Sequence, residues 1–162
     1  MDYLDSLTEK CKKQVTELFP WEVAEKPFEW AETLIVDVRE PYEFRVGHIK
    51  NSINVPRGIL ETASTFGYED TVPELASARD KKIVLACRSG KRSLWAGCTM
   101  LALGFSDVFS LRTGIRGWND YEQPLYDQQE QQVDIKLLDE FFEPEISPEQ
   151  LGHGWIIKDW RV

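Results

Sequence analysis

The chain has 162 residues, of which 42% are hydrophobic and 29% charged, a composition typical of one globular domain with a sizeable core. The formal net charge of −9 disfavours nucleic acid as a partner, because binding there depends on Lys and Arg neutralising phosphates. Every apolar run is shorter than the ~20 residues of a membrane-spanning helix, so no membrane partner is expected either.

The N-terminal stretch MDYLDSLTEKCKKQ lacks the apolar centre of a signal peptide, which predicts a cytoplasmic protein. Within it, residues 6–14 are predicted to form a short amphipathic helix, and residues 1–13 are assigned to an N-terminal helical segment. The following VTELFPWEVAEK predicts a brief strand and then a helix that opens at Pro20.

Four apolar runs follow: TLIVDV (33–38), SINV (52–55), KIVLAC (82–87) and DVFSL (107–111). Their apolar character is continuous, without alternation, which indicates buried parallel strands. Helical patterns lie between them, in EPYEFRVGH (40–48) and SLWAGCTMLALG (93–104). Strands that alternate with helices predict an α/β sandwich with a mostly parallel sheet.

The three cysteines, Cys11, Cys87 and Cys98, do not have the spacing of metal ligands, and only His48 and His153 could add imidazoles. Reduced thiols are therefore expected, with no metal and no cofactor. Cys98 lies about 16 Å from Cys87 along a helix that rises about 1.5 Å per residue, which is too far for a disulfide. Cys98 is assigned to the core, and Cys11 is expected to be incidental.

Cys87 comes directly after an apolar run and directly before the basic sequence RSGKRS. Ligands of open parallel sheets bind at the carboxyl ends of strands, where loops lead into helices. A curled loop at residues 88–92 would aim backbone N–H groups and a helix dipole at the sulfur, and so favour the thiolate. Cysteine is more often a buried small apolar residue, but the basic neighbours here are costly to bury without a purpose. We therefore predict a nucleophilic cysteine.

Basic residues gather around this cysteine in a chain that is otherwise strongly acidic. Residues 79–106 hold one acid, Asp80, and six basic side chains: Arg79, Lys81, Lys82, Arg88, Lys91 and Arg92. A positive region of this size suits a small anion better than a polymer.

From residue 14 to residue 126 the chain resembles the rhodanese family of sulfurtransferases. The matching segments are LIVDVREPYEFRVGHIKNSINVP (34–56), KKIVLACRSGKRS (81–93) and GFSDVFSLRTGIRGW (104–118). The resemblance implies one rhodanese domain over 14–126, a three-layer sandwich around a five-stranded sheet. It also implies that Cys87 becomes a persulfide and that the loop from Cys87 to Arg92 is the active-site loop.

The residues expected to bind the substrate are Arg88, Ser89, Gly90, Lys91 and Arg92. Ser93 and Asp37 are expected to support them, and Asp37 could either hold loop cations or cap its own strand. His48 is expected to make a structural hydrogen bond, because a thiolate stabilised by amides needs no general base.

The predicted activity is that of a thiosulfate sulfurtransferase. The Cys87 thiolate would attack the outer sulfur of a small anionic donor, thiosulfate or a small persulfide, and pass that sulfur to a thiol acceptor, or to cyanide in an assay, by a ping-pong route. The alternative is a carrier that takes persulfide sulfur from one protein and delivers it to a sulfur-acceptor protein. A non-catalytic interaction module is disfavoured by the intact loop.

Phosphatases and arsenate reductases use a related loop, with Cys, five residues and then Arg. Here Ser93 occupies that sixth position and Arg92 comes one residue earlier. The shorter loop makes a tighter cradle, which favours a sulfur atom over a tetrahedral oxyanion.

Residues 127–162, an acidic and aromatic C-terminal extension, match no part of the family pattern. Residues 128–142 are predicted to form a helix, and HGWIIKDW (153–160) to add an edge strand. The aromatic side chains require docking somewhere. Because burial of apolar residues outweighs screened attraction between charges, the extension is expected to pack away from the active-site loop.

Overall fold

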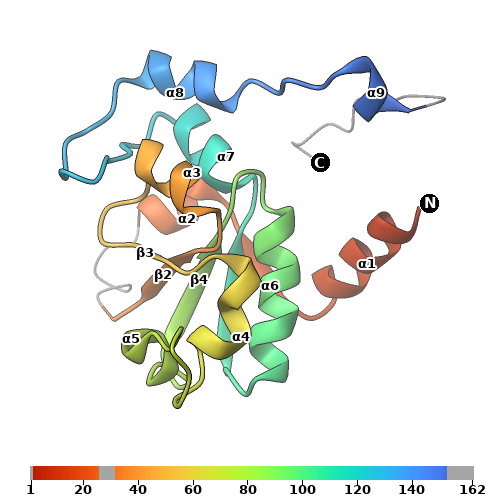
Figure 1. The fold of residues 1–162 in the computed structure, drawn as a ribbon, viewed down its shortest axis with the longest axis vertical. Helices are drawn as coiled ribbons and strands as arrows, with labels where there is room; N and C mark the ends of the chain where they lie inside the picture. Colours follow the sequence, from red (N-terminus) through yellow and green to blue (C-terminus); the bar gives the residue numbers. More distant parts are fainter. Residues whose placement is uncertain (1, 26–31, 153–162) are drawn as a thin grey trace.

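The computed structural model describes residues 2–25 and 32–152, and a parallel β-sheet lies at its centre (Figure 1). Within the described residues the sheet has five strands in the order β1-β5-β4-β2-β3, and each neighbouring pair is parallel. The strands are β1 (Thr16–Leu18), β2 (Leu34–Asp37), β3 (Ile53–Asn54), β4 (Lys82–Ala86) and β5 (Asp107–Leu111). Four of them lie in the four apolar runs, and β1 is the brief strand expected within VTELFPWEVAEK, so the expected α/β fold is confirmed.

Helices cover both faces of the sheet. They are α1 (Tyr3–Lys12), α2 (Pro20–Ala24), α3 (Pro41–Val46), a 3-10 turn η1 (Arg57–Ile59), α4 (Leu60–Ala63), α5 (Pro73–Ala76), α6 (Lys91–Ala102), α7 (Gly114–Asp120), α8 (Ile135–Phe142) and α9 (Pro148–Leu151). No helix in the described ranges has the length and apolar character needed to cross a membrane.

Two apolar clusters join the helices to the sheet. On one face, Val36 of β2 packs in a cluster with Met100 of α6 and residues of α4 and α5. On the other face, Val84 of β4 lies in a cluster with Trp118 of α7 and Phe142 of α8. Each such side chain stabilises the fold by about 1.5–3 kcal/mol when fully buried. The C-terminal extension is thus part of the core through α8.

Helix α1 packs against α6, on the side of the molecule away from α8 (Figure 1). It begins before the predicted residue 6, because the Asp2 carboxylate accepts a hydrogen bond of 2.8 Å from the Asp5 amide and caps the helix. Cys11 is buried in this contact and Cys98 packs beside it. Burial raises the pKa of the Cys98 thiol, and its hydrogen bond with Cys11 raises it further, to about 12. Cys98 therefore stays a neutral thiol, as a packing role requires, and Cys11 is its partner rather than incidental.

The predicted helix over 128–142 is shorter in the structure, and α8 begins only at Ile135. The Asp127 carboxylate accepts hydrogen bonds from the backbone amides of Gln129 (2.8 Å) and Gln131 (3.0 Å), which closes a turn there. Asp134 then caps α8 by accepting from the Lys136 amide at 2.8 Å. Acidic side chains at turn and cap positions explain why the acidic stretch is not helical throughout. The predicted strand at 153–160 lies outside the described residues.

Candidate active site

Cys87 lies directly after β4, at the carboxyl end of the sheet, and the loop that follows it leads into α6. Its sulfur accepts hydrogen bonds from the Gly90 amide, at 3.1 Å, and from the Ser93 hydroxyl, at 3.4 Å. The α6 helix points its N-terminus at the same loop, and its dipole favours negative charge on the sulfur. The Cys87 side chain is 0% exposed, so a reagent reaches it only when covering groups move.

Two glycines, one in the loop and one at the start of α7, allow the loop and α7 to approach closely. Gly90 has a φ of +93°, and a Cβ there would lie 3.0 Å from the Thr113 nitrogen. A Cβ on Gly114 would lie 2.4 Å from the Cys87 carbonyl oxygen, so no other residue fits without displacing the loop. This close approach lets the Ile115 amide donate to the Cys87 carbonyl, at 2.7 Å.

Behind the sulfur, two buried serines form a small hydrogen-bonded group. The Ser93 hydroxyl lies 2.8 Å from the Ser110 hydroxyl and 3.1 Å from the Gly90 carbonyl oxygen. The structure therefore places Ser93 beside the sulfur, and its role in supporting the substrate-binding residues stays a prediction. Ser110 was not predicted, and the signal available for it was a serine inside the apolar strand DVFSL.

Arg92 makes a two-pronged contact with Glu43 of α3, since each of two guanidinium nitrogens donates to one carboxylate oxygen at 2.8 Å. Burial raises the pKa of the Glu43 carboxyl, but the Arg92 hydrogen bonds and the Glu40 amide together hold it below its ordinary value. Hydrogen bonding to Glu43 raises the pKa of Arg92. The Arg92 guanidinium is thus committed to Glu43, which the sequence analysis did not assign to the site.

Asp37, at the end of β2, binds Arg39 and not the cations of the loop. Its carboxylate accepts from the Arg39 side chain at 2.9 Å and 2.6 Å, and both residues are fully buried. Arg39 continues this contact by donating to the Gly47 carbonyl at 2.7 Å. Asp37 therefore organises the segment that carries Glu43. Of the two roles predicted for it, direct contact with the loop cations does not occur, because its carboxylate is held by Arg39.

Arg88 points toward the C-terminal extension. Its guanidinium donates to the Phe142 carbonyl at 2.5 Å, and the neighbouring Arg116 lies 3.9 Å from the Glu143 carboxylate. The prediction that the extension packs away from the loop is wrong. Apolar burial does drive its docking, since Leu138 and Phe142 are 2% exposed, but the surface that receives them borders the loop.

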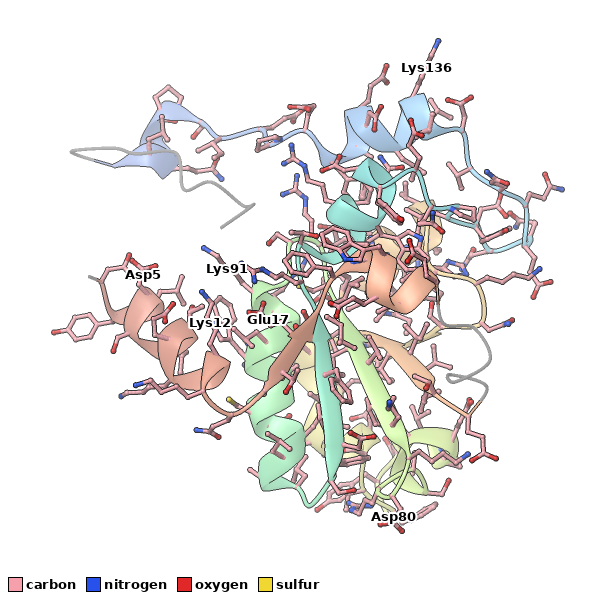
Figure 2. All side chains as sticks on the ribbon, turned by 180° about the vertical axis from the view of Figure 1, so that it is seen from behind. Asp5, Lys12, Glu17, Asp80, Lys91 and Lys136 are labelled. Carbon is pink, nitrogen blue, oxygen red and sulfur yellow. The ribbon has the colours of Figure 1, made fainter. Side chains whose placement is uncertain are left out.

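The remaining predicted residues have less specific surroundings. Ser89 and Lys91 are half-buried, and Figure 2 shows Lys91 at the end of α6 that lies toward the extension. The His48 ring stacks on Phe44, and its Nδ1 lies 2.9 Å from the Phe44 carbonyl oxygen, which is the structural role expected of it.

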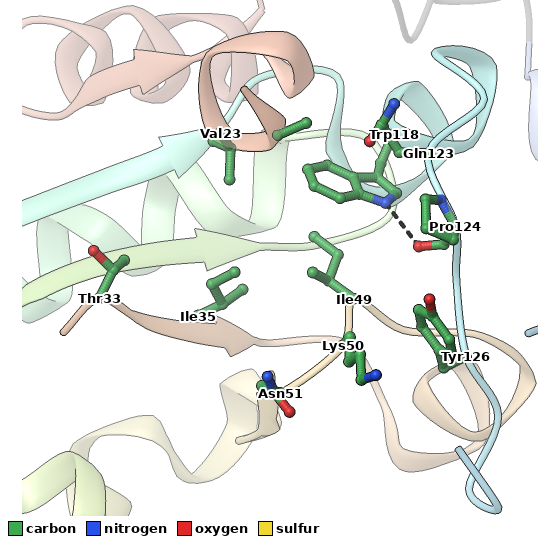
Figure 3. Close-up of a pocket in the computed structure, with 11 residues that line it drawn as sticks. Val23, Thr33, Ile35, Ile49, Lys50, Asn51, Trp118, Gln123, Pro124 and Tyr126 are labelled. Atoms are coloured by element: carbon green, nitrogen blue, oxygen red, sulfur yellow. Dashed lines mark hydrogen bonds between the residues drawn. The ribbon is translucent and has the colours of Figure 1, made fainter. Parts of the chain in front are cut away.

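Cavities occur beside the loop and away from it. One of about 500 Å³ is bordered by Arg57, Glu61 and Arg92. Another of about 420 Å³, shown in Figure 3, lies where Ile35, Ile49 and Trp118 meet, and residues 87–92 are not among those that line it. The Trp118 indole closes one side of this second cavity by donating to the Pro124 carbonyl at 3.1 Å.

The chain resembles known proteins both in sequence and in structure. The family model of the rhodanese-like domain matches residues 21–121. A putative mitochondrial thiosulfate sulfurtransferase of Schizosaccharomyces pombe is 29% identical over 103 residues, which cover 62% of this chain and 72% of that protein. A tRNA uridine(34) hydroxylase of Pectobacterium carotovorum is 37% identical over 84 residues, which cover 52% of this chain but only 22% of that protein. Among solved structures, a protein of unknown function from Rhodopseudomonas palustris, titled a possible tyrosine phosphatase, superposes with a TM-score of 0.69 at 26% identity, covering 77% of this chain and 95% of that one.

Proposed function

Because the chain belongs to the rhodanese-like domain family, we propose that it is a sulfurtransferase in which Cys87 carries the sulfur atom as a persulfide. The observation that supports this most is the position of the Cys87 sulfur, which accepts the Gly90 amide at the N-terminus of α6. The same donors stabilise a thiolate before the reaction and a persulfide anion after it. The name of the yeast relative, a putative thiosulfate sulfurtransferase, points the same way.

In the first half-reaction the Cys87 thiolate attacks the outer sulfur of thiosulfate. The new S–S bond forms as the old S–S bond breaks, and the electron pair of the broken bond leaves with sulfite. The enzyme then holds Cys–S–S⁻, and no oxidant or reductant is consumed. Positive side chains near the loop, above all Arg88 and Arg116, stabilise the negative charge that collects on the departing group.

In the second half-reaction an acceptor thiolate attacks the terminal sulfur and regenerates the Cys87 thiolate. The donor product leaves before the acceptor binds, which makes the kinetics ping-pong. Cyanide replaces the thiol in an assay and becomes thiocyanate. The cavity beside Arg92 and Arg57 gives an acceptor space next to the loop. Free thiols at all three cysteines suit a reducing, cytoplasmic setting.

A phosphatase of the same loop type is the weaker candidate, although the Rhodopseudomonas protein carries that name. An oxyanion cradle needs a free guanidinium at the end of its loop. Here Arg92 gives both of its outer nitrogens to Glu43. Nor does the hydroxylase name extend to this chain, because the match covers 22% of that protein and a net charge of −9 disfavours RNA.

Steady-state kinetics with thiosulfate and cyanide test the proposal. Parallel lines in double-reciprocal plots, loss of turnover in Cys87→Ser and normal turnover in Cys98→Ser are expected. Turnover that survives in Cys87→Ser would overturn it. A carrier of sulfur between proteins is the alternative. It would load Cys87 stoichiometrically but turn over slowly with small donors and acceptors.

A further inference from the structure

Two arginines from different elements lie side by side at the mouth of the active-site loop. The backbone amide of Arg116, in α7, donates to the Arg88 carbonyl at 3.0 Å, which fixes the two residues next to each other. Burial lowers the pKa of Arg88, and the positive charge of Arg116 lowers it further. The two positive charges repel each other, and an anion near both of them is favoured.

The C-terminal extension supplies negative groups to this pair. The Phe142 carbonyl, at the C-terminal end of α8, accepts from Arg88 at 2.5 Å, and the following residue, Glu143, brings its carboxylate to 3.9 Å from Arg116. Phe142 is anchored, because its ring is buried in the core. The Glu143 side chain is 71% exposed, so it is able to swing away from the arginines into solvent.

We propose that the extension completes the anion-binding side of the active site and sets its preference for charged donors. The Phe142 carbonyl positions Arg88 beside Arg116, and the Glu143 carboxylate competes with an anionic sulfur donor for the two guanidiniums. Glu143 is therefore a specificity-determining residue. The inference depends on the proposed function only for the identity of the donor.

Competition from Glu143 should slow the reaction of Cys87 with anionic reagents only. An anionic reagent must displace Glu143 before it meets the arginines, whereas a neutral reagent gains nothing from meeting them. Removing the Glu143 charge should thus speed reaction of Cys87 with anions and leave its reaction with neutral molecules unchanged. An exposed ion pair corresponds to a change of about two- to fivefold. The gain should shrink as salt screens the charges.

Alkylation of Cys87 tests this without any sulfur chemistry. Iodoacetate is an anion and iodoacetamide is its neutral analogue, and each transfers its carbon to the Cys87 sulfur as iodide leaves. The rate at Cys87 is followed by peptide mass spectrometry in the wild type, Glu143→Gln and the control Glu140→Gln, an exposed acid of α8. We expect the iodoacetate-to-iodoacetamide ratio to rise about two- to fivefold in Glu143→Gln and to stay unchanged in Glu140→Gln. Equal ratios in the two variants would overturn the proposal.

The contribution of Arg116 is tested by comparing Arg116→Gln with a control variant, Arg112→Gln. Arg116→Gln should lower the same ratio about tenfold, since a charge-assisted contact is lost. Arg112→Gln removes an equal charge from the same segment, but its guanidinium lies 4.7 Å over the Phe19 ring, and it should change nothing. Equal effects of the two arginine variants would show that only net charge matters, and would overturn the proposal.

Measuring the loading of Cys87 by thiosulfate distinguishes a failure of this inference from a failure of the proposed function. Faster loading of Cys87 in Glu143→Gln supports both. If thiosulfate leaves Cys87 unmodified while the alkylation ratios respond as expected, the proposed function fails and the anion site stands. If thiosulfate loads Cys87 at one rate in Glu143→Gln and Glu140→Gln, the function stands and the inference fails.

Discussion

The two flanks of the active-site loop are held in different ways. On one flank, Arg92 is fixed by Glu43, which is 5% exposed and lies within the segment that matches the family model. On the other, Arg88 is held by a carbonyl of the C-terminal extension, beyond that segment, with the exposed Glu143 near Arg116. The first contact has two part-buried hydrogen bonds to a carboxylate, whereas the second combines one hydrogen bond with a long ion pair.

The difference indicates that the two flanks have different roles. A paired, shielded carboxylate and guanidinium keep their geometry, so the Arg92 flank sets the shape of the loop. An exposed carboxylate near two guanidiniums exchanges readily with other anions, so the Arg88 flank is adjustable. Arg92, which sequence reasoning assigned to the substrate, is on this account mainly a positioning residue.

The largest expected effect comes from breaking the docking of the extension. Leu138→Ala removes a side chain that is 2% exposed and should lower the free energy of unfolding by about 2–3 kcal/mol. Leu137→Ala, one residue away and 61% exposed in the wild type, should change it by less than about 0.5 kcal/mol. Urea denaturation of both variants checks the pair. Equal stabilities would mean that α8 does not form part of the core.

A smaller loss is expected on the opposite flank. Glu43→Gln leaves the Arg92 guanidinium without its counter-charge and should cost about 1–2 kcal/mol, less than for a fully buried pair because the Arg92 side chain is 31% exposed. Glu74→Gln, at an exposed position, is the matched control. Thermal unfolding should show a lower midpoint for Glu43→Gln alone. If its midpoint equalled that of the control, the Arg92 flank would not be the rigid one.

The same flank predicts a pH dependence of stability. The pKa of Glu43 in the folded protein lies below its ordinary value, so its contribution is fully present above the pKa of the unfolded chain and is lost as the pH falls through the lower, folded value. The stability difference between the wild type and Glu43→Gln should therefore shrink between about pH 5 and about pH 3. Urea denaturation across that range measures it. A constant difference would contradict the Arg92 pairing.

The smallest effect is expected at the basic residue between the two flanks. Lys91 is half-buried at the first position of α6, and the contacts described for the arginines do not involve it. Lys91→Gln should change stability by less than about 0.5 kcal/mol and the rate of thiosulfate loading by less than about threefold. Stopped-flow loading rates test this. A tenfold slower loading rate in Lys91→Gln would show that Lys91 binds the anion together with Arg88 and Arg116, and would contradict the distinction between the two flanks.

Local sequence patterns predicted the sheet and the position of Cys87. Buried parallel strands have continuous apolar runs, and a cysteine at the end of such a run, followed by RSGKRS, places its sulfur at a helix start. Helix ends were less accurate, because Asp127 and Asp134 act through turns and caps that composition does not reveal.

Contacts between distant residues could not be predicted in this way. Glu43 lies 49 residues from Arg92, and Phe142 lies 54 residues from Arg88. The Phe142 contact uses a backbone carbonyl, which carries no side-chain signal at all. Both partners depend on how α3 and α8 pack, and packing emerges only in the folded chain.

The central claim is that Cys87 accepts and releases one sulfur atom, and intact-protein mass spectrometry tests it most directly. The protein is mixed with thiosulfate, its mass is measured, and the measurement is repeated after a thiol is added. We predict a gain of one sulfur atom, located at Cys87, that disappears with the thiol and does not occur in Cys87→Ser. A protein whose mass is unchanged by thiosulfate, or a gain that persists in Cys87→Ser, would contradict the account.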